Sequence, residues 1–268
     1  MHRDSPLKAI LVVFLTAIIC SSLVSAAVVM LRPIQLNNQL LERSSNIMQL
    51  TGLVADGEMP GDEEMLELYR SLDTRIVDLE AAWFDDSIDP HTFNKRRAVN
   101  DPVLGIDIPT HLDRAGMGRR SRYAPVHLVW KGRELERVIM PIRGSGMWSM
   151  LYGFVAVESD LNTIAAAVFY EQNETPGLGD QITRPDWIAQ WTGRQIFDAL
   201  GNPQFAVSEG AVEPGSPTAL HKVDALTGAT VTADAVTSLV QYWFGPHGYR
   251  DFLQSLRENP LEKPRRDG

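Results

Sequence analysis

Apolar residues dominate the start of the chain and recur at shorter intervals after it. Residues 9–31 contain no charged side chain. A helix of that length, rising about 1.5 Å per residue, spans about 34 Å, and a bilayer core is roughly 30 Å thick. We therefore predict a transmembrane helix over 9–31, preceded by a short tail over 1–8.

A cleaved signal peptide is the alternative interpretation of this stretch. Val24-Ser25-Ala26 resembles a cleavage site, and Arg3 and Lys8 give the N-terminus positive charge. The length favours an anchor, because the apolar part of a signal peptide runs for about 7–15 residues.

Charge does not orient the helix, since Arg32 and Arg43 follow it much as Arg3 and Lys8 precede it. The short tail and the long remainder of the chain favour a cytoplasmic tail and a domain on the other side of the membrane.

Helical spacing continues beyond the apolar stretch. Residues 34–53 mix apolar and polar side chains in a loosely helical pattern, and Gly57–Asp62 interrupt it. Apolar residues return at helical spacing, which predicts a second helix with a core-facing stripe: Met65, Leu66, Leu68, Leu72, Ile76 and Leu79. We interpret residues 32–82 as a helical membrane-proximal segment.

The remainder, residues 83–268, is predicted to be a mixed sheet-and-helix domain. Residues 85–124 are charged and interrupted by prolines, which indicates irregular surface. After them, short runs rich in valine, isoleucine and aromatic residues predict four strands: Val126–Trp130, Glu134–Ile142, Leu151–Val157 and Thr163–Tyr170. The fold class is therefore α+β, a single N-terminal transmembrane helix followed by this domain.

Further elements are expected after the four strands. Thr183 and Asp186 have the form of a capping box, and the apolar spacing after them predicts a helix to about Leu200. Short strands are predicted at Phe205–Val207 and Leu220–Asp224. A closing helix is predicted from the apolar spacing of Tyr249, Phe252, Leu253 and Leu256.

Charge and reactive side chains exclude several functions. The formal net charge of −9 at pH 7 disfavours nucleic acid and anionic lipid surfaces as partners. Cys20 is the one cysteine, so this chain alone forms no disulfide, cysteine-rich zinc site or iron–sulfur cluster. The histidines lack metal-ligand spacing, and no dinucleotide fingerprint is present, so we expect no metal site and no NADH binding. The basic clusters Lys95–Arg97 and Arg119–Arg122 are interpreted as solvated faces, with partner subunits or lipid headgroups as the alternative.

Four threonines and a glycine stand where another helix is about to begin. Apolar residues recur at one helix face at Val236, Leu239, Val240, Trp243 and Phe244, and Gly245-Pro246 ends the pattern. Residues 227–230, Thr-Gly-Ala-Thr, therefore lie at or just before a helix N-terminus, which favours a phosphate. The alternative is that Thr230 or Thr232 is an ordinary N-cap and Asp234 a first-turn acid.

A second polar segment, residues 171–179, follows the last of the four strands. Pro176-Gly177 favours a tight turn with positive φ at the glycine, and Gly179 permits the backbone to approach a flat ligand. An ordinary turn without a ligand is the alternative.

The first segment resembles a flavoprotein signature. Asp224-x-x-Thr227-Gly228-Ala229-Thr230 is similar to the Asp-x-x-(Ser/Thr)-Gly-Ala-Thr motif of proteins that carry FMN esterified to the last threonine. The resemblance implies that Thr230 is the attachment residue and that the other four form the recognition context for a separate flavin transferase, which uses FAD as donor.

The second segment resembles a motif that accompanies that signature. Glu-Thr-Pro-Gly-Leu-Gly at residues 174–179 implies that the two motifs meet in the fold. It also implies that the ring end of the FMN contacts this turn, with Glu174, Thr175 and Leu178 near the isoalloxazine and the backbone of Gly177 and Gly179 close by.

The segment Gly-Ser-Gly-Met-Trp, ending at Trp148, is similar to one branch of these flavoproteins, the C subunits of the sodium-translocating NADH:quinone reductases. Trp148 is accordingly a candidate cofactor contact. The likeness runs from the anchor to the final helix. Two departures are small: Thr227 stands where serine is common, and Asn173 where glycine is common.

This resemblance implies an electron carrier in a six-subunit translocase of the bacterial inner membrane, with a single-pass anchor and a periplasmic domain. The B, D and E subunits are the implied neighbours, with electrons arriving from an iron–sulfur centre in membrane subunits and leaving to the FMN of the B subunit. The alternatives are the G subunit of an Rnf-type electron-transport complex, a flavin-based redox-sensing membrane protein, and an anchored subunit without flavin.

Overall fold

The computed structural model describes residues 6–53 and 60–263 of the chain. Contacts divide the chain into two units, residues 1–45 and 46–268, which are considered separately. Most of the tail expected at residues 1–8 lies outside the described residues, as does half of the interruption expected at Gly57–Asp62.

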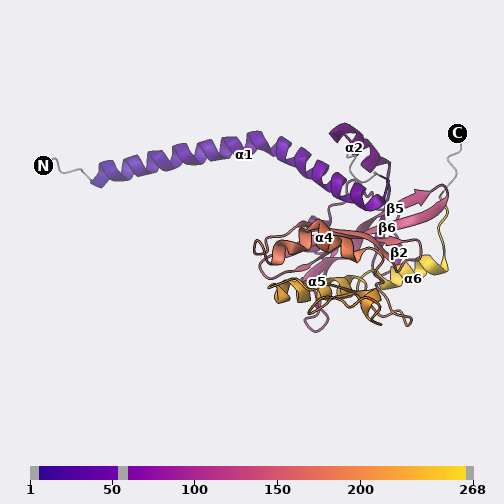
Figure 1. The fold of residues 1–268 in the computed structure, drawn as a ribbon. Coiled ribbons are helices and arrows are strands. Elements are labelled where there is room, and N and C mark those ends of the chain that lie inside the picture. Colours follow the sequence, from indigo (N-terminus) through magenta and orange to yellow (C-terminus); the bar gives the residue numbers. More distant parts are fainter. Residues whose placement is uncertain (1–5, 54–59, 264–268) are drawn as a thin grey trace. The chain divides into compact units, whose positions relative to one another are not determined.

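The helix α1 runs from Pro6 to Thr51 (Figure 1). Its described residues up to 45 make up the first unit, and its last turns belong to the second unit. Within α1, Leu7–Arg32 has a mean hydropathy of 2.5 and is exposed throughout. Among the described residues this is the one helix long and apolar enough to cross a membrane. The helix continues past residue 31 without a break, as the sequence predicted.

The described residues of the second unit form a six-stranded antiparallel sheet in the order β2-β1-β5-β6-β7-β8. The four strands predicted from the sequence are confirmed as β5 to β8, each connected to the next by a short turn. The strand bounds are β1 Asp73–Asp78, β2 Trp83–Phe84, β5 Tyr123–Lys131, β6 Glu134–Ser145, β7 Met150–Glu158 and β8 Ile164–Glu171.

Both faces of the sheet are buried. In β6, Val138 and Met140 belong to one apolar cluster and Ile139 to the other. The first cluster includes α5, Thr230–Trp243, and α6, Arg250–Glu258. The second includes the last turns of α1 and the helix α2, Asp62–Ser71. The alternation of side chains along a strand therefore presents an apolar surface to helices on each side.

The second predicted helix is wrong in its C-terminal half. The helix α2 ends at Ser71, and Asp73–Asp78 form β1, which pairs antiparallel with β5. Apolar residues at 72, 76 and 79 fit a helical stripe, but β-branched Thr74, Ile76 and Val77 favour extended backbone, and pairing with β5 decides the outcome.

The helix predicted from Thr183 to Leu200 is also wrong. The described backbone forms a short α4, Pro185–Ile188, flanked by the 3₁₀ segments η1, Gly179–Thr183, and η2, Ala189–Trp191. The Thr183 hydroxyl donates to the Asp180 carbonyl instead of capping a helix. Gly193 has φ of 79°, so the helix cannot continue past Trp191.

Of the other predicted elements, the two short strands are shorter than expected and the last two helices are confirmed. The two short strands are β9, Ala206–Val207, and β10, Lys222–Val223, which pair in parallel. The 3₁₀ segment η3, Ala219–His221, directly precedes β10. The segment expected to be irregular contains three short elements, α3 Lys95–Asn100, β3 Gly105–Asp107 and β4 Arg119–Ser121. The helices predicted after residue 230 and at the end of the domain are confirmed as α5 and α6.

One edge of β6 is covered by side chains rather than by a strand. Its pairing with β5 reaches only Ile139, whereas its pairing with β7 continues to Ser145. Beyond that point the Pro141 carbonyl accepts from Tyr249 Oη at 2.7 Å, and the Arg143 carbonyl accepts from Trp243 Nε1 at 2.6 Å.

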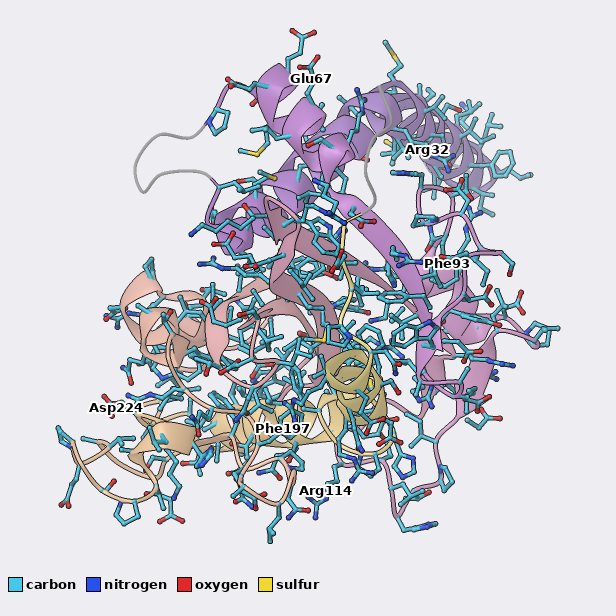
Figure 2. The ribbon with its side chains drawn as sticks, turned by 90° about the vertical axis from the view of Figure 1, so that its right-hand side faces the viewer. Arg32, Glu67, Phe93, Arg114, Phe197 and Asp224 are labelled. Carbon is cyan, nitrogen blue, oxygen red and sulfur yellow. The ribbon has the colours of Figure 1, made fainter. Side chains whose placement is uncertain are left out.

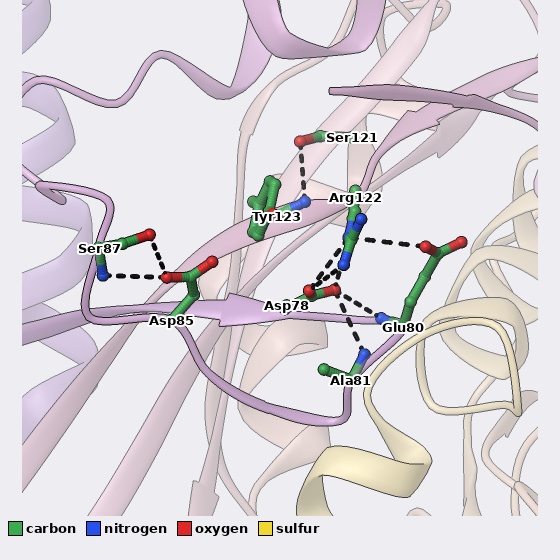
Figure 3. A network of polar contacts seen from close by, with 8 residues as sticks. All are labelled: Asp78, Glu80, Ala81, Asp85, Ser87, Ser121, Arg122 and Tyr123. Atoms are coloured by element: carbon green, nitrogen blue, oxygen red, sulfur yellow. Dashed lines mark hydrogen bonds and ion pairs between the residues drawn. The ribbon is translucent and has the colours of Figure 1, made fainter. Parts of the chain in front are cut away.

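The second basic cluster is not a solvated face. Arg120 is buried, and Arg122 donates to both carboxylate oxygens of Asp78, the shortest contact being 2.6 Å (Figure 3). The backbone N–H groups of Glu80 and Ala81 also donate to Asp78. Burial raises the pKa of the Asp78 carboxyl, but the hydrogen bonds from Arg122 and from the two N–H groups outweigh it, and the net pKa lies below its ordinary value.

We expect Asp78→Asn to lower the free energy of unfolding by about 1–3 kcal/mol at pH 7, because Arg122 loses the closer of its two charged partners, Asp78 and Glu80. The pKa of Asp78 is lower in the folded state, so its contribution is complete above the unfolded value of about 3.9 and is lost as the pH falls through the folded value. The difference from the unaltered chain should therefore be constant from pH 7 to about pH 5 and shrink at lower pH.

Chemical denaturation of the full chain in detergent at several pH values measures this difference. Asp85→Asn is the matched control, because the Asp85 carboxylate accepts from the backbone N–H and the hydroxyl of Ser87 and forms no ion pair with Arg122 among the described residues. Equal losses in the two variants would contradict a special role for the Asp78–Arg122 pair.

Candidate functional site

The start of α5 is built by a glycine turn. Gly228 has φ of 74°, and the Ala229 N–H donates to the Leu226 carbonyl at 3.1 Å. Ala229 is the N-cap residue, buried and without a side-chain capping bond, and Thr230 is the first helical residue and exposed. The interpretation of Thr230 or Thr232 as the N-cap is therefore wrong. The helix begins with backbone N–H groups that have no intrahelical acceptor.

The turn at residues 174–179 lies directly against this helix start, so the two motifs meet as predicted. Gly177 has φ of 76°, as expected for the Pro-Gly turn. A Cβ at Gly228 would lie 2.9 Å from Leu178 Cδ2. Gln181 Nε2 donates to the Leu178 carbonyl at 2.7 Å and to the Thr227 carbonyl at 3.1 Å, and so links the two segments. Sequence reasoning missed Gln181, because no pattern marks it.

The turn between β6 and β7 supplies an exposed aromatic side chain to the same place. Trp148 Nε1 donates to Thr175 Oγ1 at 3.1 Å, while 68% of the residue remains exposed. Met147 and Leu178 are also exposed apolar residues. This surface can therefore contact an apolar or aromatic group.

Glu174 differs from its neighbours because its carboxylate is directed into the protein. It is 4% exposed and accepts from the backbone N–H groups of Met147 and Trp148. It also accepts from Thr232 Oγ1 at 2.6 Å, and Thr232 is buried as well. Close packing surrounds this contact, since a Cβ at Gly179 would lie 2.7 Å from Thr232 Oγ1.

Asp224, the first residue of the signature, is held by backbone and side-chain contacts at the outside of the domain (Figure 2). Its carboxylate accepts from the Val212 N–H at 2.7 Å, its own N–H donates to Gln190 Oε1, and its carbonyl accepts from Trp187 Nε1. Asp224 therefore fixes the loop before β10 beside the approach to α5.

A cavity of about 570 Å³ borders the start of α5. Its lining includes the signature residues Asp224, Thr227, Gly228 and Thr230, together with Gln181 and Arg184. Hydrogen bonds from Arg184 lower the pKa of the neighbouring Asp186 carboxyl, so the guanidinium charge is shared with an ionised acid. The cavity volume falls in the range of small-molecule and cofactor sites.

The candidate site lies within a segment of the chain that matches a known domain family. Residues 146–245 match the FMN-binding domain family, and this range includes the 174–179 turn, Thr230 and the whole of α5. Fold and site together define a protein that carries an FMN-binding domain behind an N-terminal apolar helix.

Relatives of known function narrow this class. The C subunit of the Na(+)-translocating NADH-quinone reductase from Pseudomonas aeruginosa is 38% identical over 257 residues, which cover 96% of this chain and 98% of the relative. The corresponding subunit from Vibrio anguillarum is 37% identical over 260 residues, which cover 97% of this chain and 98% of that relative. The crystal structure of NqrC from Shewanella oneidensis has a TM-score of 0.72 and 32% identity, covering 81% of this chain and 98% of that one. The chain belongs to the family of C subunits of Na(+)-translocating NADH-quinone reductases, which confirms the resemblance noted in the sequence.

The close packing around Glu174 yields a stability prediction. Gly179→Ala should lower the free energy of unfolding by about 1–3 kcal/mol, because its Cβ would lie 2.7 Å from Thr232 Oγ1 and 2.8 Å from Glu174 Cβ. Gly210→Ala is the control, since a Cβ there meets nothing within 4 Å. Urea denaturation measures the free energy of unfolding of both variants. Equal values would show that the turn accommodates a methyl group at residue 179.

Proposed function

We propose that this chain is the electron-carrying subunit of a Na⁺-translocating NADH:quinone reductase and holds FMN covalently through Thr230. The observation that carries the proposal is the placement of Thr230. Its side chain is exposed at the first position of α5, on the border of a cavity lined by the rest of its signature. A modifying enzyme can therefore reach the hydroxyl in the folded chain.

The residues present fit a phosphate at this position. The first N–H groups of α5 and the positive end of its dipole favour an anion. Thr227 and Gly228 are exposed beside Thr230. These features support the phosphate end of FMN at the helix start, and the cavity is large enough for part of the cofactor.

The attachment step balances with FAD as the donor. The Thr230 hydroxyl oxygen bonds to the FMN-side phosphorus, the pyrophosphate bond breaks, AMP leaves, and the hydroxyl proton is taken up by the flavin transferase. A threonine hydroxyl is a weak nucleophile by itself. The transferase therefore supplies the activation, and the chain supplies an accessible acceptor.

The exposed apolar surface supports the other end of the cofactor. When bound, FMN supplies reversible electron transfer at its ring. Trp148 and Leu178 offer apolar contact to the ring, and Thr175 and the backbone of Gly177 and Gly179 lie in the same turn. Hydrogen bonds and charge near flavin heteroatoms are the means by which a protein tunes the potential.

The names of the relatives support a place in a membrane complex. In this proposal the chain is anchored once in the bacterial inner membrane by Leu7–Arg32, with the domain in the periplasm. Electrons arrive from an iron–sulfur centre in membrane subunits and pass to the FMN of the B subunit, and the B, D and E subunits are the neighbours of the chain. The family assignment favours this complex over an Rnf-type complex or a redox sensor.

Attachment is tested with Thr230→Ala, produced together with a flavin transferase. We expect complete loss of the FMN mass increment and of flavin fluorescence from the denatured chain. Thr227→Ala is the control, because it alters the recognition context and keeps the acceptor hydroxyl, so it should retain part of the modification. Intact mass and peptide mapping decide the matter, and covalent flavin on the Thr230→Ala chain would refute the assignment.

Topology is tested with cysteines in a Cys20→Ala background. Thr218→Cys, at an exposed position of the domain, should react with a membrane-impermeant maleimide in intact spheroplasts. His2→Cys, in the short tail, should react only after lysis. The opposite pattern would place the domain in the cytoplasm.

A further inference from the structure

Glu174 is a buried acid at the junction of three separate segments. Its two oxygens accept from the backbone N–H groups of Met147 at 3.2 Å and Trp148 at 3.1 Å, and from Thr232 Oγ1 at 2.6 Å. Within the described residues, 6–53 and 60–263, Glu174 forms no ion pair. Its burial is therefore compensated by hydrogen bonds from the β6–β7 turn and from the first turn of α5.

Two glycines make room for this carboxylate. A Cβ at Gly146 would lie 2.5 Å from Glu174 Oε1, and a Cβ at Gly179 would lie 2.8 Å from Glu174 Cβ and 3.0 Å from Oε2. Both glycines belong to segments that the sequence marked as candidate ligand contacts. Here they pack against Glu174, and Thr232 completes the enclosure.

The junction connects the residues assigned to the two ends of the cofactor. Trp148 donates its backbone N–H to Glu174 and its indole N–H to Thr175. The junction therefore holds the β6–β7 turn, which carries the exposed indole of Trp148. Thr232 is two residues after Thr230 on α5. Glu174 therefore ties the attachment end of the site to its aromatic end.

We propose that Glu174 and Thr232 are positioning residues, which hold the turn carrying Trp148 in a set relation to the start of α5 and so determine the surroundings of the flavin ring. Neither residue is assigned a contact with the ring in this proposal, which rests on the function proposed above. A single phosphoester leaves a long cofactor free to rotate about its own bonds, so the ring is held only if the surface beneath it is held. Preorganised surroundings of this kind depend on packing and hydrogen bonds behind the residues that touch the ligand.

The test uses the full chain, produced with a flavin transferase, in four variants. Thr232→Val removes the hydroxyl that donates to Glu174, and Thr232→Ser restores a hydroxyl. Glu174→Gln tests the same junction from its other side. Thr237→Val is the matched control, because Thr237 lies on the same helix and its hydroxyl accepts from the Val207 N–H and donates to the Ala233 carbonyl, away from the junction.

Intact mass, the visible circular dichroism of the bound flavin and its reduction potential are measured for each variant. We expect Thr232→Val and Glu174→Gln to carry covalent FMN with normal mass, yet to show a shifted circular dichroism spectrum and potential. The Thr232→Ser and Thr237→Val chains should match the unaltered chain. If one of the first two variants does not fold, the other decides.

Two outcomes would overturn the proposal. One is a flavin spectrum and potential in Thr232→Val and Glu174→Gln equal to those of Thr237→Val. The other is loss of the FMN mass from a folded Thr232→Val chain, which would place Thr232 in the modification reaction instead. Absence of the FMN mass from the unaltered chain would refute the proposed function, and intact mass separates that failure from the other two.

Discussion

Both faces of the antiparallel sheet are apolar, and covering them is the constraint on which the rest of the domain depends. Val138 and Met140 face one cluster and Ile139 the other, so helices are required on each side. One side receives α5 and α6, and the other receives α2 and the end of α1. The packing of Val236, Leu239 and Val240 against the sheet fixes α5, and the first turn of α5 is where the candidate site is built.

The long strands β5 to β8 could be predicted from the sequence, whereas β1 could not. The β5 to β8 strands alternate and connect through short turns, so local pattern and tertiary pairing agree. The β1 strand pairs with β5, about fifty residues later, and its apolar spacing also fits the helix that precedes it. In the 183–200 segment the apolar residues suggested a helix, but Gly193 at positive φ ends it. The spacing of apolar residues reveals neither the pairing of β1 with β5 nor the positive φ of Gly193, because both segments also fit a helical pattern.

The two motifs of the candidate site could be named from the sequence, but the contacts between them could not. The resemblance predicted that they meet, and Leu178 does lie against Gly228. Gln181 and the Thr232–Glu174 contact depend on how three segments pack, and no spacing in the sequence indicates them. The sequence also suggested that Gly179 serves a ligand, whereas its close neighbours are Glu174 and Thr232.

The edge of β6 beyond Ile139 has a consequence for association. An open strand edge is a template on which another chain can add a strand, and proteins that must stay separate block such edges. Here Pro141 has no N–H to donate. The carbonyls of Pro141 and Arg143 are already occupied by Tyr249 and Trp243. These features disfavour the addition of a strand from a neighbouring copy at this part of β6.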